Sequence, residues 1–132
     1  MGKRYTIAVD FDGVLHSYTS PWVDHHVIPD PPIPGAIEWL ERISADFDVV
    51  IFTTRGKTEA GRVAVARWIS EHGYTGHDFT VTAEKPPALI YLDDRAVRFE
   101  GIYPTPDEIH RARPWKVRAA AAGEAPADTV RE

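Results

Sequence analysis

The sequence predicts an α/β fold, a three-layer sandwich built around a mainly parallel central sheet. Two observations lead to this prediction. Short runs rich in β-branched residues alternate along the chain with stretches in which apolar residues recur every three or four positions. The short runs are also almost continuously apolar, which is typical of strands in a parallel sheet that helices cover on both faces.

Four strands are expected, and most of them end in polar residues. In chain order the runs lie at residues 5–9, 48–55, 78–83 and 88–94, of which the third is the weakest. Asp10 and Asp12 follow the first run, Thr53 and Thr54 close the second, and Asp93 and Asp94 end the fourth. Ligands of open α/β sheets bind outside the carboxyl ends of the strands. We therefore expect these side chains to converge on one site.

Two helices are expected between the strands. The first covers residues 34–47, where apolar residues recur at helical spacing and Pro34 suits the first turn. The second covers residues 57–74 and is expected to stop at Gly73, because glycine commonly follows the last turn of a helix.

The chain is expected to form one domain over residues 1–118, since 132 residues suit a single core. Residues 16–34 are rich in proline, aromatic residues and histidine and are too long for a minimal connection. We expect them to form a small flap over the site. Residues 119–132 carry few large apolar groups and are expected to be a flexible tail.

Composition narrows the function classes. No apolar run approaches the ~18 residues that span a bilayer, and the first residues lack the pattern of a signal peptide, so a cytoplasmic protein without a membrane partner is expected. The chain contains no cysteine, which excludes disulfides and thiolate metal sites. The net charge of -5 gives no general attraction to nucleic acid, which is left as a partner only through a substrate end.

The spacing of Asp10 and Asp12 predicts a cation or a shared proton between their carboxylates. Residues two apart on a strand point the same way, and like charges that close repel unless a cation or a shared proton lies between them. Mg²⁺ prefers oxygen ligands and often combines carboxylates with substrate phosphate. One carboxylate can then attack phosphorus, while the other gives a proton to the leaving oxygen and takes one from water.

Four motifs follow one another along the chain: DFDGV, VVIFTTR, EKPPA and IYLDD. This order, which covers residues 5 to about 100, resembles the haloacid dehalogenase-like (HAD) phosphohydrolase superfamily. The resemblance implies a Rossmann-like core and a magnesium-dependent phosphomonoesterase that works through an aspartyl-phosphate. The small flap resembles the capless branch of the superfamily, and YLDDRAVRFEG is similar to a set of small bacterial and phage members of unassigned substrate.

The resemblance also implies roles for the four aspartates. Asp10 would be the nucleophile and a magnesium ligand. Asp12 would be the general acid and base, with its carbonyl oxygen on the metal. Asp93 and Asp94 would complete the metal site, and which of the two ligates the metal directly stays open.

Phosphate binding is implied for Thr53 and for Lys85, which would neutralise negative charge. Many family members place a whole helix between the lysine and the final acidic pair, whereas here only a short segment separates them, so Lys57 competes for the role. The remaining candidates for substrate binding flank the motifs: Gly13, His16, Thr54, Arg55 and Arg95, of which the arginines could equally pair with neighbouring carboxylates.

Other interpretations stay open. Tyr18 and Trp22 in the flap could stack on a base or sugar ring, and the substrate could be a nucleotide or a nucleic-acid end phosphate. A phosphate- or nucleotide-binding or receiver-like regulatory domain without turnover is the alternative function, although a receiver normally carries its phosphoacceptor aspartate after the third strand. A zinc site is a further alternative, with ligands from the flap: His16, Asp24, His25 and His26.

Overall fold

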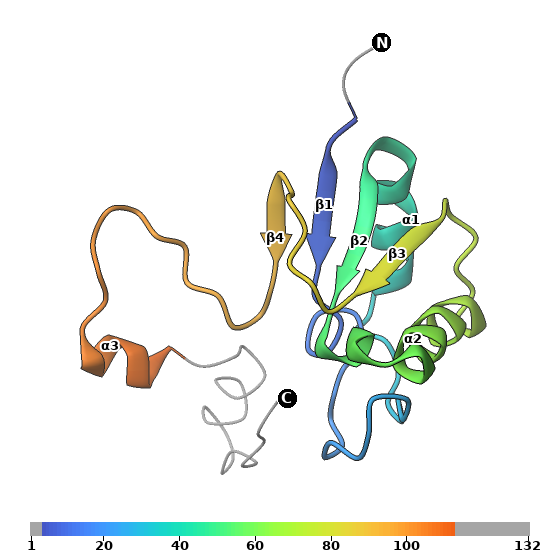
Figure 1. Ribbon diagram of the computed structural model, residues 1–132, viewed down its shortest axis with the longest axis horizontal. Helices are drawn as coiled ribbons and strands as arrows, with labels where there is room; N and C mark the ends of the chain where they lie inside the picture. Colours follow the sequence, from blue (N-terminus) through green and yellow to red (C-terminus); the bar gives the residue numbers. More distant parts are fainter. Residues whose placement is uncertain (1–3, 113–132) are drawn as a thin grey trace.

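The structure is a computed structural model that describes residues 4–112 (Figure 1). Its centre is a four-stranded sheet in which all neighbours run parallel, in the order β3-β2-β1-β4. The strands are β1 (Thr6–Val9), β2 (Asp48–Phe52), β3 (Phe79–Thr82) and β4 (Ile90–Leu92). The predicted α/β fold with a parallel central sheet is confirmed. The predicted tail at 119–132 and the predicted domain end at 118 lie outside the described residues.

The helices are α1 (Ala36–Asp46), α2 (Glu59–Glu71) and α3 (Pro106–Arg111), and a short 3-10 helix, η1 (Thr54–Lys57), precedes α2. α1 begins after the predicted start, because Gly35 has a left-handed backbone (φ 85°) and Pro34 therefore lies before the helix. η1 takes up the end of the predicted second strand, since the Thr53 hydroxyl accepts a hydrogen bond from the Arg55 N–H and turns the chain. None of the described helices is long and apolar enough to cross a lipid bilayer.

The hydrophobic core lies between the sheet and two of the helices. It joins one face of β1 and β2 to α1 and α2, through Ile7, Val9, Val49 and Ile51 of the strands and Ile37, Leu40, Val65, Trp68 and Ile69 of the helices. Both helices cover the same face, as right-handed crossovers that step from β1 to β2 to β3 in one direction require. Burial of each large aliphatic side chain stabilises the fold by about 1.5–3 kcal/mol.

The opposite face of the sheet is crossed by an extended linker, residues 83–89. β3 and β4 lie at opposite edges of the sheet, so the linker between them must cross β2 and β1 (Figure 1). It packs on this face, where the Tyr91 hydroxyl donates a hydrogen bond to the Pro86 carbonyl (2.6 Å) and Ala8 is only 1% exposed. The three layers are therefore α1 with α2, the sheet, and this linker.

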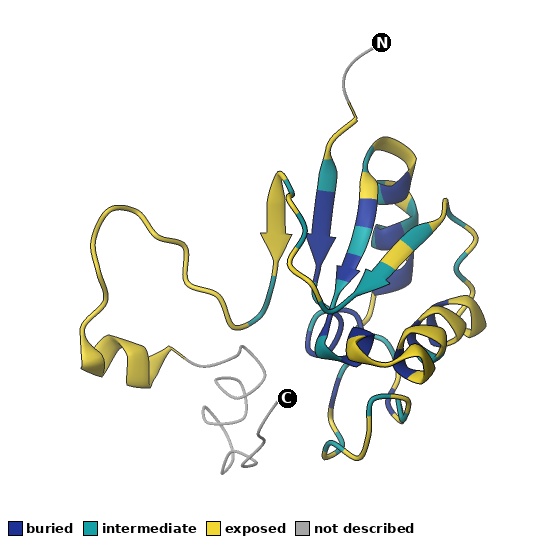
Figure 2. Ribbon diagram, viewed as in Figure 1, coloured by how far each residue is buried: buried dark blue, intermediate teal, exposed yellow. Residues whose placement is uncertain are grey.

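β4 is the most exposed strand of the sheet. All three of its residues are exposed, whereas β1 beside it is buried along most of its length (Figure 2). From β4 the chain leads away from the sheet to α3, and every residue from 95 to 112 is exposed. The strand that carries Asp93 and Asp94 at its end is thus held in the sheet by β1 alone.

Candidate active site

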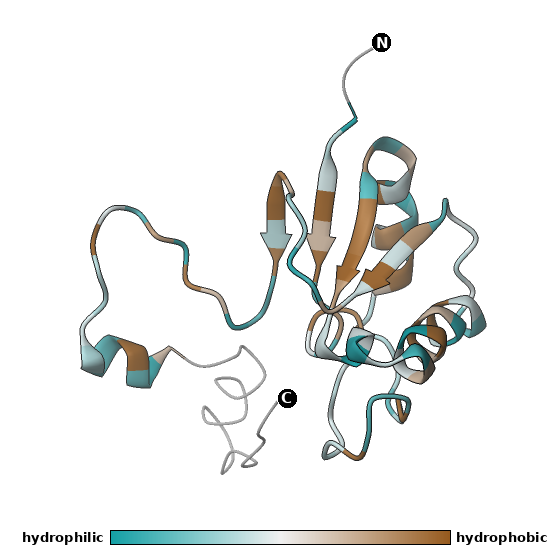
Figure 3. Ribbon diagram, in the orientation of Figure 1, coloured by the Kyte–Doolittle hydropathy of each residue, from teal (hydrophilic) through white to brown (hydrophobic). Residues whose placement is uncertain are grey.

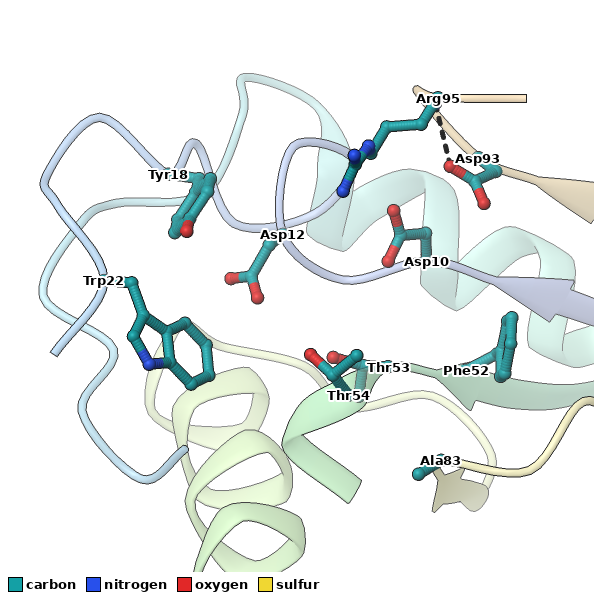
Figure 4. Close-up of a pocket in the computed structure, with 10 residues that line it drawn as sticks. All are labelled: Asp10, Asp12, Tyr18, Trp22, Phe52, Thr53, Thr54, Ala83, Asp93 and Arg95. Carbon is teal, nitrogen blue, oxygen red and sulfur yellow. Dashed lines mark hydrogen bonds between the residues drawn. The ribbon is translucent and has the colours of Figure 1, made fainter. Parts of the chain in front are cut away.

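A pocket opens at the carboxyl ends of β1, β2 and β4. Its volume is about 190 Å³. The residues that line it are Asp10, Asp12, Tyr18, Trp22, Phe52, Thr53, Thr54, Ala83, Asp93 and Arg95 (Figure 4). Of the strand-end residues expected to converge, the structure brings all but Asp94 to the pocket wall, and Asp94 lines a neighbouring shallow cavity together with Asp93.

Three carboxylates gather on one side of this pocket. Asp10, Asp93 and Asp94 each place an oxygen within 4.8 Å of the other two. They meet because β1 and β4 are adjacent, and the ladder continues one residue past β1, where the Asp10 N–H donates to the Leu92 carbonyl (2.9 Å). Three negative charges this close repel one another. An all-oxygen donor set of this kind fits a hard divalent cation such as Mg²⁺.

The Asp12 side chain has different partners. Its carboxylate accepts a bifurcated hydrogen bond from Arg55 Nε, at 2.9 Å to Oδ2 and 3.1 Å to Oδ1. His16 Nδ1 lies 2.8 Å from Oδ1. His16 Nε2 accepts from the Asp30 N–H (3.1 Å), so the ring proton is on Nδ1 and is donated to Asp12. Both partner side chains are fully buried.

These partners decide the charge of Asp12. Burial alone would raise the pKa of its carboxyl. The hydrogen bond from His16 and the positive charge and hydrogen bond of Arg55 outweigh burial, so the net pKa lies below the ordinary value. The carboxyl is therefore ionised at neutral pH. It lines the pocket as an anion whose orientation two buried side chains determine.

Arg55 also anchors the flap. Its Nη1 donates to the carbonyls of Asp24, His25 and Val27, at 3.1, 2.9 and 2.9 Å. The guanidinium carbon lies 4.6 Å from the centre of the Trp22 ring, in cation–π contact. Arg55 is 1% exposed and does not line the pocket, so the structure places this predicted substrate-binding residue behind Asp12.

The flap supplies the aromatic wall of the pocket. Tyr18 and Trp22 lie on the flap side of the pocket, beside Asp12 (Figure 4). Tyr18 has a left-handed backbone (φ 55°), which costs a non-glycine residue about 1 kcal/mol and which the surrounding packing must hold in place. The flap is closed at its base by Ser20, whose N–H and hydroxyl donate to Asp30 at 2.8 and 2.6 Å.

The two threonines occupy the β2 side of the pocket. Thr53 is buried and its N–H donates to the Thr82 carbonyl (2.9 Å), while Thr54 begins η1. The turn that follows depends on Gly56, because a Cβ there would lie 2.5 Å from the Thr82 carbonyl carbon. This close approach packs η1 against the end of β3 and sets where both hydroxyls lie.

The predicted lysines lie elsewhere. Lys85 and Lys57 are exposed, and neither lines the pocket. Lys85 Nζ lies 4.8 Å from the Tyr91 ring centre, on the linker face of the sheet. Among the residues that line the pocket, the cation is Arg95, whose N–H donates to Asp93 Oδ1 (2.8 Å) and whose side chain extends along the rim of the pocket (Figure 4). A catalytic role for either lysine stays a prediction.

The flap histidines do not form a metal centre. His16 is buried against Asp12 and does not line the pocket, and His25 and His26 lie 3.3 and 3.8 Å from Asp24 oxygens. Within residues 4–112 the acidic cluster of three aspartates described above is the one group of potential ligands close enough to hold an ion. Gly13, another predicted substrate-binding residue, has φ 85° and lines the shallow cavity beside Asp94.

Comparison of the chain with protein-family models, with curated proteins and with solved structures yields no match. The function is therefore inferred from the geometry of the pocket. Sequence reasoning gave no role to Phe52 or Ala83, which line it because they stand at the ends of β2 and β3.

Proposed function

We propose that the chain is a magnesium-dependent phosphohydrolase of the phosphomonoesterase type that acts through an aspartyl-phosphate on Asp10. One observation carries the proposal: three carboxylate oxygens lie within 4.8 Å of one another beside a pocket that also holds a fourth carboxylate and two threonines. Such an arrangement concentrates negative charge where a cation and a phosphoryl group would both be accommodated.

The acidic cluster fits Mg²⁺, and Asp10, Asp93 and Asp94 would hold it. When bound, the ion would neutralise the carboxylates and polarise phosphoryl oxygens. Asp10 is oriented by the Phe11 N–H, which donates to its Oδ1 (2.8 Å). The Asp10 carboxylate attacks phosphorus, an O–P bond forms to the aspartate, and the bond to the leaving oxygen breaks.

The other pocket residues bind the phosphoryl group. The Thr53 and Thr54 hydroxyls would donate to its oxygens from the β2 side, and Arg95 would offer a positive charge from the β4 side, since all three residues line the pocket. The Thr53 hydroxyl is held by the hydrogen bond that it accepts from the Arg55 N–H, so it needs little rearrangement as charge develops. The turn after β4, in which the Arg95 N–H donates to Asp93, sets the point from which the exposed Arg95 side chain extends. Arg95 takes the neutralising role that the sequence suggested for a lysine.

Asp12 is suited to the second step. In that step a water oxygen bonds to phosphorus, the Asp10–phosphorus bond breaks, and the proton of the water passes to Asp12. Arg55 and His16 position the Asp12 carboxylate for this transfer without contacting the substrate. Protonation of the leaving oxygen by Asp12 in the first step stays an expectation from the family resemblance.

The substrate we propose is a nucleotide or a nucleic-acid end phosphate. The pocket is smaller than the roughly 300–1,000 Å³ typical of sites that enclose a whole ligand. It therefore takes the phosphoryl end, while the remainder of the substrate lies toward the flap, where the half-buried Trp22 ring can stack on a base. Tyr18, the other ring that the sequence suggested for stacking, is only 3% exposed and is not open to a base. A receiver-like domain is less well supported, since Ala83 rather than an acidic residue follows β3 at the pocket.

Phosphate release from a panel of phosphomonoesters tests the proposal. The parent protein is expected to release phosphate with Mg²⁺ and not with chelator, and Asp10→Asn is expected to abolish release without lowering the unfolding temperature in chelator. Asp78→Asn, the same substitution at an exposed position away from the pocket, is the matched control and should retain activity. Metal-independent release, or full activity in Asp10→Asn, would refute the proposal.

A further inference from the structure

A large apolar surface lies exposed on and beyond β4. It has two parts, which we name the β4 surface and the arm. The β4 surface comprises Leu89, Ile90, Tyr91 and Leu92, which are 57, 51, 41 and 39% exposed. The arm is the segment 95–111, with apolar side chains at Val97, Phe99, Ile102, Tyr103 and Ile109 that are 58–83% exposed. Both parts are visible in Figures 2 and 3 as exposed stretches with brown, hydrophobic segments.

Single exposed apolar residues are ordinary, but nine of them within residues 89–109 mark an interaction surface in two parts. The nine side chains together expose on the order of 1,000 Å², against the ~800 Å² that each partner contributes to a stable protein complex. Strands of parallel sheets are normally buried on both faces, so β4 in particular lacks the cover that its neighbour β1 has.

The arm has local order although it leads away from the sheet (Figure 1). The Phe99 and Tyr103 rings lie 5.0 Å apart, which groups the apolar side chains of the arm. α3 begins with a capping box, in which the Thr105 hydroxyl accepts from the Glu108 N–H and the Glu108 carboxylate accepts from the Thr105 N–H. The arm thus has a capped helix and a ring contact of its own, although none of its residues is buried.

We infer that a second copy of this chain covers this surface, with the arm of each copy lying on the β4 surface of the other. A two-fold pair is self-complementary, so one contact covers both apolar parts of both chains at once. The charges agree with this contact. The β4 surface has no charged side chain, and the arm carries as many acidic residues as arginines: Glu100, Asp107 and Glu108 against Arg95, Arg98 and Arg111.

The pairing also bears on the site, a consequence that rests on the proposed function. β4 is followed directly by Asp93 and Asp94, and the arm starts at Arg95. Cover of β4 by a partner would therefore hold two of the three carboxylates of the acidic cluster in place.

Sedimentation velocity of the full chain over a broad range of concentration tests the inference without any use of activity. The parent is expected to sediment as a dimer that dissociates on dilution. The double variant Phe99→Ser with Ile102→Ser is expected to be monomeric throughout, with an unchanged far-ultraviolet circular dichroism spectrum over the sheet and helices. Val23→Ser with Val63→Ser, at exposed apolar positions outside the surface, is the matched control and should remain dimeric.

Hydrogen exchange on the parent gives a second measurement that needs no variant. Amides of β4 and the arm are expected to be more protected at high than at low protein concentration. A parent that is monomeric at every concentration, an arm variant that stays dimeric, or protection that is independent of concentration would each overturn the inference. High protection of β4 in a monomeric parent would mean that the chain covers β4 with its own residues, and low protection at every concentration would mean that nothing covers it.

Discussion

Arg55 Nε lies 2.9 Å from one oxygen of Asp12 and 3.1 Å from the other, in a buried ion pair between residues 43 positions apart in the chain. The same guanidinium donates to three flap carbonyls and contacts the Trp22 ring. One side chain thus joins the end of β1, the turn after β2 and the flap. The orientation of Asp12 and the position of the flap are consequently linked.

Replacement of Arg55 should therefore lower the free energy of unfolding by a large amount. Arg55→Met keeps most of the length of the side chain but leaves the buried Asp12 carboxylate without its cation, which costs about 3–5 kcal/mol. Arg55→Lys keeps the charge and loses the planar set of donors, so it should lie between Met and the parent. Urea unfolding measures both free energies. Arg67→Met, on the exposed side of α2, is the control and should change stability by less than about 0.5 kcal/mol.

If Arg55→Met were no less stable than Arg67→Met, the ion pair would not be a feature of the folded state. Activity adds a separate readout under the proposed function. Arg55→Lys should lower kcat more than it raises KM, because Arg55 positions Asp12 and does not line the pocket.

Asp30 gives a prediction on pH. Burial alone would raise the pKa of this carboxyl. Hydrogen bonds from the Ser20 hydroxyl and N–H outweigh burial, so the net pKa lies below the ordinary value. A carboxyl with a lowered pKa in the folded state adds stability above its unfolded pKa of about 3.9, and this contribution is lost as the pH falls through the folded pKa.

Asp30→Asn should accordingly be less stable than the parent at pH 7, by about 1–2 kcal/mol. The difference should shrink as the pH is lowered below about 4, because the parent then loses the contribution that the variant lacks. Unfolding titrations at a series of pH values measure it. A difference that stays constant down to pH 2 would show that the charge of Asp30 contributes nothing to stability.

Gly56 should tolerate no side chain. A Cβ at this position would lie 2.5 Å from the Thr82 carbonyl carbon, so Gly56→Ala must move η1 away from β3 and, with it, Thr53 and Thr54. At Gly73 no atom lies within 4 Å of the added Cβ, and Gly73→Ala carries only the strain of its left-handed backbone, about 1 kcal/mol. Thermal unfolding should therefore show Gly56→Ala to be the less stable of the two, and equal stabilities would contradict the close packing.

The strands and the strand-end positions of the acidic residues could be predicted because β-branched runs and the loss of hydrophobicity at their ends are local signals. The side-chain partners could not. Arg55 was expected at the substrate because it follows the threonines, yet its length lets it reach back to the buried Asp12. His16 likewise lies beneath the pocket, since its two ring nitrogens meet Asp12 and Asp30 there. Such contacts join residues that the fold brings together, so no local pattern in the sequence indicates which long side chain reaches which buried charge.

The region after β4 shows a different limit. α3 was not predicted, although Thr105, Pro106 and Glu108 are a local signal for its start, a capping box with proline in the first turn. The exposure of β4 could not be predicted, because an apolar run such as ALIYL is typical of a buried strand. Whether such a strand is covered depends on which other residues pack against it, and the run itself carries no signal of that.

Loss of one carboxylate from the acidic cluster should change thermal stability in opposite directions with and without Mg²⁺. Asp94→Asn removes one of three mutually repelling carboxylates, so in chelator the variant should be at least as stable as the parent. With Mg²⁺ the order should reverse, because a ligand that binds only the folded state stabilises it in proportion to its affinity, and the variant offers one anionic ligand fewer. Thermal unfolding with increasing Mg²⁺ measures both effects, and Asp78→Asn should follow the parent in each. An equal Mg²⁺-induced shift in Asp94→Asn and the parent would mean that this carboxylate is not a ligand, whereas reversal would identify the cluster as the metal site independently of any substrate.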